Sequence, residues 1–291
     1  MKFSFNLKKL LLCVSVFVLV LASASLSFAA EGGKPVKLGL LSKLNMTQSD
    51  FHRFIAESVT AGSANIFSKN SQGGHRGNTT VIFYDSLIAL QLALESGEID
   101  EAGMPEAIAE YVMNVNENRY DISCVVKTIT TSLAMGFRAS DDPALRNKIN
   151  DILLGMKADG TLAVLINKYI LNPGISDPEP VKFDKYKNVK ENIKVAITGD
   201  LPPIDLIASD GTPTGFNTAV LAEIGRRAKI NIELVDIDSG ARAAALASGR
   251  VDAVFWFMSF KGIDNQPDIP SGVVLSESYF DYNDYLHIVK K

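Results

Sequence analysis

From residue 36 to the end of the chain, apolar and polar positions follow two alternating patterns. Short apolar runs, typical of buried strands, occur as VKLGLL, TTVIFYD, IKVAITG and VDAVFWFM. Between them, segments such as SLIALQLALESG and PTGFNTAVLAEIGRRA place apolar residues three and four apart, which is the spacing of one helix face. Strands that alternate with helices in this way predict an α/β fold.

The remaining segments extend the same alternation. Further strands are predicted at IDEAG, ISCVV, SLAMGFRA, INIELVDI, GVVLSESYF and YLHIVKK. Further helices are predicted after a capping box at residues 47–50, and at PEAIAEYVMN, ALRNKINDILLGMKADG, TLAVLINKYI and SGARAAALASG. The composition of SKNSQGGHRGN is typical of a loop, and that of NPGISDPEP is typical of a linker.

The seven-residue pattern L-x-S-G-x-(I/V)-D occurs twice, as Leu94–Asp100 and Leu246–Asp252. One interpretation is chance, because glycine commonly ends a helix in the left-handed conformation. The flanks favour a second interpretation, since in both copies a predicted helix precedes the glycine and a predicted strand follows it. An internal repeat of this kind indicates that the chain holds two similar α/β lobes.

The first 30 residues have the pattern of a secretory signal peptide. Three lysines within the first nine residues precede the apolar run Leu10–Leu21, and small residues follow up to Ala30. A membrane anchor is the alternative, but the apolar run is shorter than the ~20 residues that a spanning helix needs. We therefore expect residues 1–30 to be removed, and the mature protein to be extracytoplasmic, in the periplasm or secreted.

Composition excludes several classes of function. The chain has 29 basic and 33 acidic residues, and its formal net charge of −4 argues against a nucleic-acid partner. The three histidines are scattered, so no metal site is predicted. Cys13 lies in the leader, which leaves Cys124 as the only cysteine of the mature chain and predicts no internal disulfide. Familiar catalytic and nucleotide-binding motifs are absent from the sequence, so we predict no catalytic residue and no cofactor.

Several longer motifs carry a resemblance to a known family. AITGDLPPIDLIASDGTPTGFNTAVLAEI contains a strand, a Pro-Pro turn and a Gly-Phe motif, and LASGRVD and SESYF follow it. LESGEID and a helix with Ala-Glu-Tyr stand earlier, and the most specific match is LRNKINDILLGMKADGTLAVLINKY. In this spacing the motifs resemble the extracytoplasmic solute-binding proteins of ABC importers, in the class that binds polar amino acids.

The resemblance implies a two-lobed fold of the type II periplasmic binding proteins, with the lobes in permuted order and joined by a hinge. The family runs from first lobe to second lobe to C-terminal helices, whereas this chain begins with the second lobe. A single covalent crossover near Phe137–Asp142 would then join the lobes. The alternative is two unrelated half-proteins fused in tandem. The implied boundaries are 34–138 for the second lobe and 139–291 for the first lobe, the latter comprising C-terminal-type helices at 142–171, a linker at 172–191 and the lobe with the Pro-Pro turn at 192–291.

Ligand-binding side chains are expected where the strands of an open α/β sheet end, because helix N-termini point outward there. Arg242 is the leading candidate, as a bidentate anchor for a ligand anion at the rim of the cleft, and a solvated surface arginine is the alternative. Trp256 would stack on the ligand or pack in the core. Asp85 and Ser86 would contact the ligand or only cap a helix. The other candidates are Ser239, Ser259, Asp200, Lys261, Thr47, Asn45 and Glu106.

Residue by residue, the resemblance supports only part of the family's ligand site. Ser259 matches the ligand-contacting threonine of the family. The arginine that clamps the ligand carboxylate would fall near Asp264, and the acidic residue for the ligand amino group would fall at Met104 or Pro105, beside Glu106. Because both parts of the clamp are replaced, we expect weak or no binding of standard L-amino acids.

The function implied by the resemblance is that of a receptor, not of an enzyme. It would bind a small polar, carboxylate-bearing, amino-acid-like solute between its lobes for ABC-type transport. Its partners would be membrane permease subunits, and the receptor itself would be a monomer. One alternative is an enzyme of the same fold, similar to cyclohexadienyl dehydratases, with Asp200 or Glu106 as general acid. Another is a sensor or an orphan binding module without a small ligand.

Overall fold

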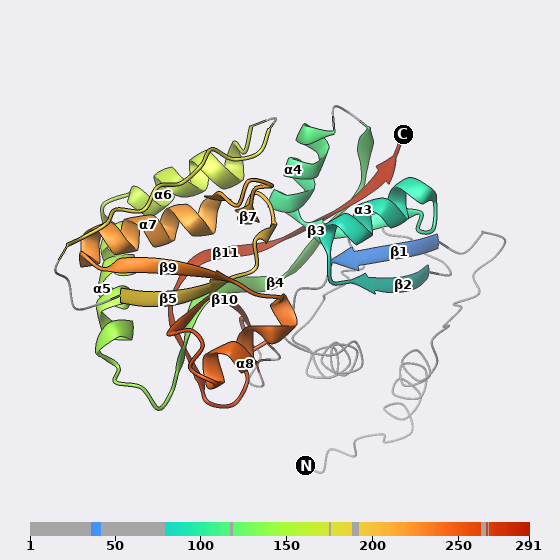
Figure 1. Cartoon of the computed structure of the whole chain (residues 1–291). Helices are drawn as coiled ribbons and strands as arrows, with labels where there is room; N and C mark the ends of the chain where they lie inside the picture. Colours follow the sequence, from blue (N-terminus) through green and yellow to red (C-terminus); the bar gives the residue numbers. More distant parts are fainter. Residues whose placement is uncertain are drawn as a thin grey trace, which may run out of the picture.

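The computed structural model describes residues 36–41, 79–116, 119–174, 176–187, 192–262, 266 and 268–291. Within these residues the fold is mixed α/β, as the alternation of strands and helices predicts (Figure 1). Eight strands form one sheet in the order β2-β1-β3-β11-β4-β10-β5-β9, and β6, β7 and β8 form a small second sheet. None of the helices in these ranges is long and apolar enough to cross a membrane. The predicted signal peptide and the helix predicted after residues 47–50 lie outside the described residues.

One end of the large sheet, with its helices, forms the N-lobe. β1 pairs in parallel with both β2 and β3, so the three strands end at the same edge. Helix α4 buries Ile108 and Val112, four residues apart, as one face of an amphipathic helix should. The elements of the N-lobe are β1 (Val36–Leu41), β2 (Thr79–Tyr84), α3 (Leu87–Ser96), β3 (Glu101–Pro105) and α4 (Glu106–Val115).

The other end of the sheet, with its helices, forms the C-lobe. β10, β5 and β9 are parallel neighbours, and helices α5 and α6 pack against α7. Helix α5 buries Ile149, Leu153 and Met156 completely, again at helical spacing. The elements of the C-lobe are α5 (Ala144–Ala158), α6 (Thr161–Ile166), a π-helical turn (Asn167–Leu171), β5 (Asn192–Ile197), β6 (Asp200–Leu201), β7 (Asp205–Ile207), β8 (Pro213–Thr214), α7 (Phe216–Ala228), β9 (Asn231–Asp236), a 3-10 turn (Ser239–Ala241), α8 (Arg242–Ala247) and β10 (Ala253–Phe260).

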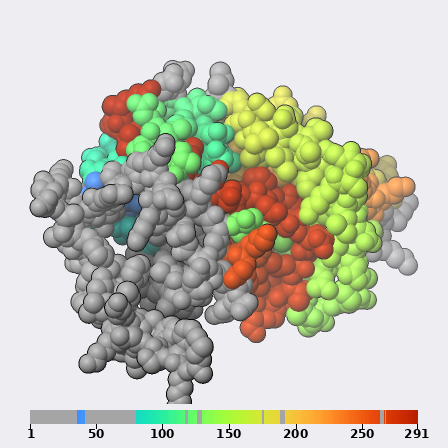
Figure 2. Space-filling view, turned by 180° about the vertical axis from the view of Figure 1, so that it is seen from behind, coloured from blue at the N-terminus to red at the C-terminus, as the bar shows by residue number. Residues whose placement is uncertain are grey.

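Two long strands, β4 (Tyr120–Arg138) and β11 (Val273–Lys290), pass through both lobes and pair with each other in antiparallel fashion. β4 also pairs with β10 of the C-lobe, and β11 also pairs with β3 of the N-lobe. On the rear face, the C-terminal residues, coloured red, are visible both near the centre and beside the N-lobe helices (Figure 2). The prediction of a single crossover is therefore wrong, because the C-terminal segment returns to the N-lobe instead of ending in the C-lobe.

The length of these two strands was also not predicted. ISCVV and SLAMGFRA were expected as two strands but belong to the single strand β4, and GVVLSESYF and YLHIVKK likewise belong to β11. Each strand has a polar middle that lacks the apolar character of a buried strand. The two middles pair with each other on either side of an irregularity, with Tyr282 opposite Thr131 and Asp284 opposite Lys127.

The repeated segment L-x-S-G-x-(I/V)-D forms the same joint in both lobes. The glycine of each copy has a positive φ angle, 76° after α3 and 73° after α8. In the first copy, Asp100 Oδ2 accepts a hydrogen bond from the backbone N–H of Lys37 in β1, with N and O 2.8 Å apart. In the second copy, Asp252 Oδ2 accepts from the backbone N–H of Lys194 in β5, also at 2.8 Å. The prediction of two equivalent helix-to-strand joints is confirmed, and chance does not explain this repeat.

Candidate functional site between the two lobes

A small pocket lies between the lobes, where β1, β3 and β5 end. β1 and β3 reach it at Leu41 and Pro105, and the segment after β5 reaches it with Leu201 and Ile204. Ligands of open α/β sheets bind beyond the carboxyl ends of the strands, so the pocket occupies the expected place. The described lining consists of Leu41, Pro105, Ile108, Leu133, Leu201, Ile204, Trp256, Met258, Tyr282 and Tyr285.

The lining of this pocket is apolar and aromatic, and no charged side chain belongs to it among the described residues. In this conformation its volume is about 30 Å³, and since a cavity needs roughly 10–15 Å³ to hold one water molecule, it has room for about two. A solute of more than a few atoms therefore requires the two lobes to separate further than they do in this conformation.

One wall of the pocket is aromatic, with Trp256 from β10 and with Tyr282 and Tyr285 from β11. The two tyrosine rings have their centroids 6.2 Å apart. Strict alternation would place residues three apart on opposite faces of a strand, but the pairing register shifts between Tyr282 and Asp284. Burial raises the pKa of Tyr282 well above its usual value and that of Tyr285 to about 12. Both hydroxyls are therefore protonated at neutral pH.

Trp256 combines burial with an unused hydrogen-bond donor. Its side chain is buried, 2% exposed, and its Nε1 atom has no hydrogen-bond partner among the described residues. The guanidinium of Arg242 lies over the indole ring, 3.9 Å from the ring centroid. The sequence left two hypotheses for Trp256, core packing and a place at the cleft. The structure is compatible with both at once.

Arg242 is buried, and not exposed at the rim of the cleft as its position after a strand suggested. Only 1% of its side chain is exposed, and Nη2 donates to Asp268 Oδ1 at 3.0 Å. Nε donates to the carbonyl of Ser239 at 2.9 Å, and Nη1 donates to the carbonyl of Trp256 at 2.5 Å. Burial lowers the pKa of Arg242, and Asp268 opposes that effect. The fork expected to bind a ligand anion already holds a protein carboxylate, so neither environment predicted for Arg242 is found.

Asp85 and Ser86 stand at the start of α3. Ser86 is the N-cap residue, and its Oγ accepts a hydrogen bond from the backbone N–H of Ala89 at 3.4 Å. Asp85 is exposed beside it. For Ser86, the helix-cap reading is confirmed, and neither residue lines the pocket.

The other predicted ligand residues in the described ranges do not gather at the pocket either. Ser239 and Ser259 are half-buried, whereas Asp200, Glu106 and Lys261 are exposed, and none of the five is part of the described lining. No group of His, Cys, Asp and Glu side chains in the described residues could hold a metal ion. Asn45 and Thr47 lie outside the described residues, so their role stays a prediction.

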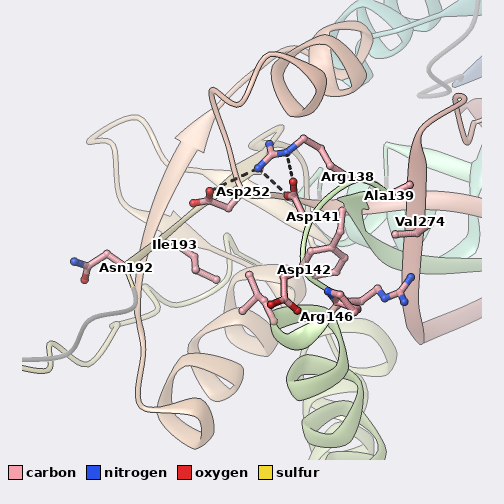
Figure 3. A pocket seen from close by; sticks show the side chains of 12 residues that line it. Arg138, Ala139, Asp141, Asp142, Arg146, Asn192, Ile193, Asp252 and Val274 are labelled. Carbon is pink, nitrogen blue, oxygen red and sulfur yellow. Dashed lines mark hydrogen bonds and ion pairs between the residues drawn. The ribbon is translucent and has the colours of Figure 1, made fainter.

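A larger pocket, of about 530 Å³, lies in the C-lobe at the amino-terminal end of β5 (Figure 3). Its most connected side chain is Arg138, the last residue of β4. Arg138 forms an ion pair with Asp141 at 2.9 Å and donates to the carbonyls of Leu246 and Val251 at 2.8 and 2.7 Å. Through these contacts the guanidinium links the end of β4 to the second copy of the repeated segment. We therefore assign Arg138 a structural role.

Asp205 is a buried carboxylate close to the inter-lobe pocket, next in sequence to Ile204. Its side chain is fully buried, and Oδ2 accepts hydrogen bonds from the backbone N–H of Thr198 at 3.0 Å and from the Thr198 hydroxyl at 3.2 Å. The other oxygen, Oδ1, has no partner among the described residues. Burial raises the pKa of Asp205, and the charge of Asp200 acts in the same direction.

This raised pKa predicts a specific pH dependence of stability. The native state binds the proton of Asp205 more tightly than the unfolded state does, so the stabilisation is present below the unfolded pKa of about 3.9 and is lost as pH rises through the native pKa. We expect the unfolding free energy of the native chain, relative to that of Asp205→Asn, to fall as pH rises above about 4. Urea unfolding of both proteins across this range measures the difference, and a difference that stays constant or grows with pH would contradict the prediction.

The matched family model covers the part of the chain that builds the C-lobe side of the pocket. Residues 193–262 match the model described as bacterial extracellular solute-binding proteins, family 3. The resemblance to solute-binding proteins is confirmed for this segment. The matched segment runs from β5 to the turn after β10 and contributes Leu201, Ile204, Trp256 and Met258 to the inter-lobe pocket. No curated protein matches the chain.

Solved structures similar to this chain include several ligand-binding proteins. The ligand-binding component of an ABC-type import system from Staphylococcus aureus has 12% identity and a TM-score of 0.43, with 89% of this chain and 66% of that chain covered. AgaA of A. tumefacien R10, in complex with agropinic acid, has 13% identity, a TM-score of 0.41, and 77% and 57% coverage. The aliphatic sulphonate binding protein SsuA from Escherichia coli has 10% identity, a TM-score of 0.38, and 89% and 62% coverage. The chain thus spans less than two thirds of the length of each.

The sequence pattern missed most of the residues that line the pocket. Among the predicted ligand residues in the described ranges only Trp256 is part of the lining, while Tyr282, Tyr285, Met258 and Ile204 were not predicted. The polar segment SYFDYNDYL contains three of the eight tyrosines of the chain. Such a cluster of aromatic residues in a strand between the lobes was the signal that could have found Tyr282 and Tyr285.

Proposed function

We propose that this chain is an extracytoplasmic receptor of the ABC-import type, which binds a small solute between its lobes and delivers it to a membrane permease. The observation that carries the proposal is the position of the inter-lobe pocket. The solute-binding segment 193–262 supplies one side of it, and the strand ends at Leu41 and Pro105 supply the other. A site shared between two lobes is what closure around a ligand requires.

Further parts of this proposal come from the sequence. They are a signal peptide at residues 1–30, a permuted lobe order and a monomeric receptor. We keep the boundaries at 34–138 and 139–291 for the other elements, whereas β4 and β11 run through both lobes. The packing of α5 and α6 on α7 supports the permuted order, because it joins the C-terminal-type helices to the lobe with the Pro-Pro turn.

The charge of the ligand differs in this proposal from the carboxylate that the resemblance implies. A carboxylate in a site shielded from water needs a cation or several hydrogen-bond donors. Arg242 is paired with Asp268, and Lys261 is exposed outside the described lining. The described lining therefore supports a solute without a carboxylate better than an amino acid.

An enzyme on the same fold receives less support than a receptor. The acids named for that role, Asp200 and Glu106, are exposed, and neither belongs to the described lining of the inter-lobe pocket. A general acid must reach the reacting atoms within hydrogen-bonding distance. We therefore propose solute binding, with neither residue in a catalytic role.

A thermal-shift experiment tests the receptor function. A solute present at 100 times its dissociation constant should stabilise the mature chain by about 2.7 kcal/mol, because it binds the folded state alone. Leu201→Glu places a charge at the edge of the pocket and should abolish this ligand-induced shift, whereas the matched surface variant Asp210→Asn should retain it. If no member of a panel of amino acids, organic acids, short peptides and neutral aromatic amides shifts the melting temperature at millimolar concentration, the proposal is wrong.

A further inference from the structure

We infer that the solute of the inter-lobe pocket is a neutral, planar aromatic or heteroaromatic molecule that carries a hydrogen-bond acceptor, as an aromatic amide does. This inference rests on the proposed receptor function and names the chemical class of its ligand. It is carried by the lining of the pocket, by the unused donor of Trp256 and by the way in which the nearest buried charges are already paired.

The described lining selects against a charged ligand. Its side chains are aliphatic, aromatic or thioether groups, with the tyrosine hydroxyls and the indole N–H as the polar atoms. The tyrosines are neutral at physiological pH, because the ordinary pKa of tyrosine is about 10 and burial raises it further for both. A carboxylate or ammonium group moved from water into such surroundings loses its hydration without gaining a countercharge.

The buried ion pair behind the aromatic wall does not change this conclusion. Arg242 lies over Trp256, but its guanidinium is paired with Asp268 at 3.0 Å and also donates to two backbone carbonyls. Asp268 Oδ2 in turn accepts a hydrogen bond from the backbone N–H of Met258 at 2.7 Å. The two charges offset each other, and the contacts that hold them come from the protein.

The indole N–H of Trp256 indicates what the ligand must offer. Tryptophan Nε1 can only donate a hydrogen bond, and a buried donor without an acceptor is rare in folded proteins. Trp256 is 2% exposed, lines the pocket and has an Nε1 atom without a partner among the described residues. A ligand with a carbonyl or ring-nitrogen acceptor in the pocket would satisfy this donor.

The arrangement of the rings favours a flat ligand. Tyr282 packs against Phe280 with a centroid distance of 5.9 Å and an angle of 26° between the rings, and against Tyr285 at 6.2 Å and 42°. These rings continue along β11 to the pocket and end there with Tyr285. Aromatic pairs at such distances are favourable in offset or tilted geometry, so a planar ligand can extend the series when the cleft is wide enough to admit it.

The only tryptophan of the chain provides the readout, because Trp256 reports on this pocket alone. Titration with benzamide and nicotinamide should change the Trp256 fluorescence saturably and raise the melting temperature. Benzoate is the charged counterpart of benzamide and should bind at least about tenfold more weakly, and L-glutamate and L-arginine should do the same. Cyclohexanecarboxamide keeps the amide without the flat ring and tests the need for planarity.

Two variants test the residues. Trp256→Phe keeps an aromatic ring but removes the N–H, so benzamide affinity by calorimetry should fall by about tenfold, the equivalent of one hydrogen bond. Tyr285→Leu should also weaken benzamide binding. Tyr186→Phe, which removes a hydroxyl bonded to Asp184 in the linker, is the matched control and should bind as the native chain does. Circular dichroism establishes that each variant is folded.

The outcomes separate this inference from the receptor function on which it rests. If benzoate, L-glutamate or L-arginine binds more tightly than the neutral amides and changes the Trp256 signal, the receptor function stands and the inference is overturned. If benzamide binds Trp256→Phe as tightly as the native chain, the role of the N–H is overturned. If neither set of compounds alters fluorescence or melting temperature, the inference is overturned, whereas the receptor function is decided by the wider panel of solutes described above.

Discussion

Replacing Asp268 with asparagine is expected to lower the unfolding free energy by about 3–5 kcal/mol, because it leaves a buried arginine without its countercharge. Arg242 and Asp268 are 1% and 0% exposed, and their nearest side-chain atoms are 3.0 Å apart. The aspartate also fixes β10 by accepting a hydrogen bond from the backbone N–H of Met258 at 2.7 Å. Urea unfolding at neutral pH measures the loss.

Two further variants test whether the loss of stability comes from the buried ion pair. Glu179→Gln removes the exposed ion pair with Lys168, which spans 3.1 Å, and should change the unfolding free energy by less than about 1 kcal/mol. The double variant Arg242→Met with Asp268→Leu removes both buried charges and should recover part of the loss, because the N–H of Met258 and the carbonyls of Ser239 and Trp256 lose these partners. If the single variant Asp268→Asn is as stable as the native chain, the ion pair does not stabilise this part of the core.

Replacing Gly215 with alanine is expected to lower the unfolding free energy by about 3 kcal/mol or more, since strain and a steric clash add. Gly215 precedes α7 with φ 95° and ψ 177°, a region that side chains with a Cβ atom rarely enter. A Cβ there would lie 2.8 Å from the carbonyl oxygen of Pro203 and 3.0 Å from that of Ile204. Both oxygens are held in place by accepting backbone hydrogen bonds from Phe216 and Asn217 at 2.9 and 2.8 Å.

The matched control for this substitution is Gly211→Ala in the neighbouring turn. Gly211 also has a positive φ angle, 82°, but an added Cβ would meet no atom within 4 Å. The loss should therefore be limited to the backbone strain, about 1–2 kcal/mol. Thermal and urea unfolding of the two variants separate the backbone strain from the steric clash. Equal losses of unfolding free energy would show that the carbonyl contacts at Gly215 are unimportant. The same contacts position Ile204, so Gly215→Ala should also disturb the pocket.

The error about Arg242 shows why the site was harder to predict than the fold. The sequence correctly predicts that Arg242 stands at the start of a helix after a core strand, since α8 begins at Arg242. Whether that side chain faces solvent or core depends on Asp268, which lies 26 residues further along the chain. Nothing in the local pattern links the two residues, because their contact forms only in the tertiary structure, where Asp268 reaches the start of α8.

The two crossing strands show the same limit at the scale of the fold. Apolar patterning located both ends of β4 and both ends of β11 but divided each strand at its polar middle. The middle segments are extended because they pair with each other, across about 150 residues of sequence. Pairing partners at that separation are chosen by the packing of the whole sheet and not by the residues of either strand.

By itself, the sequence determined the α/β class, most of the helices and strands, and the equivalence of the two L-x-S-G-x-(I/V)-D joints. These features depend on side-chain periodicity, glycine conformation and hydrogen bonds between neighbouring elements, all of which are encoded within a few residues. Only the tertiary structure decided that β11 returns to the N-lobe, that Arg242 is paired and buried, and that Tyr282 and Tyr285 line the same pocket as Trp256. Each of these depends on which distant segments meet, and burial and charge pairing acquire their energies only after those segments are in contact.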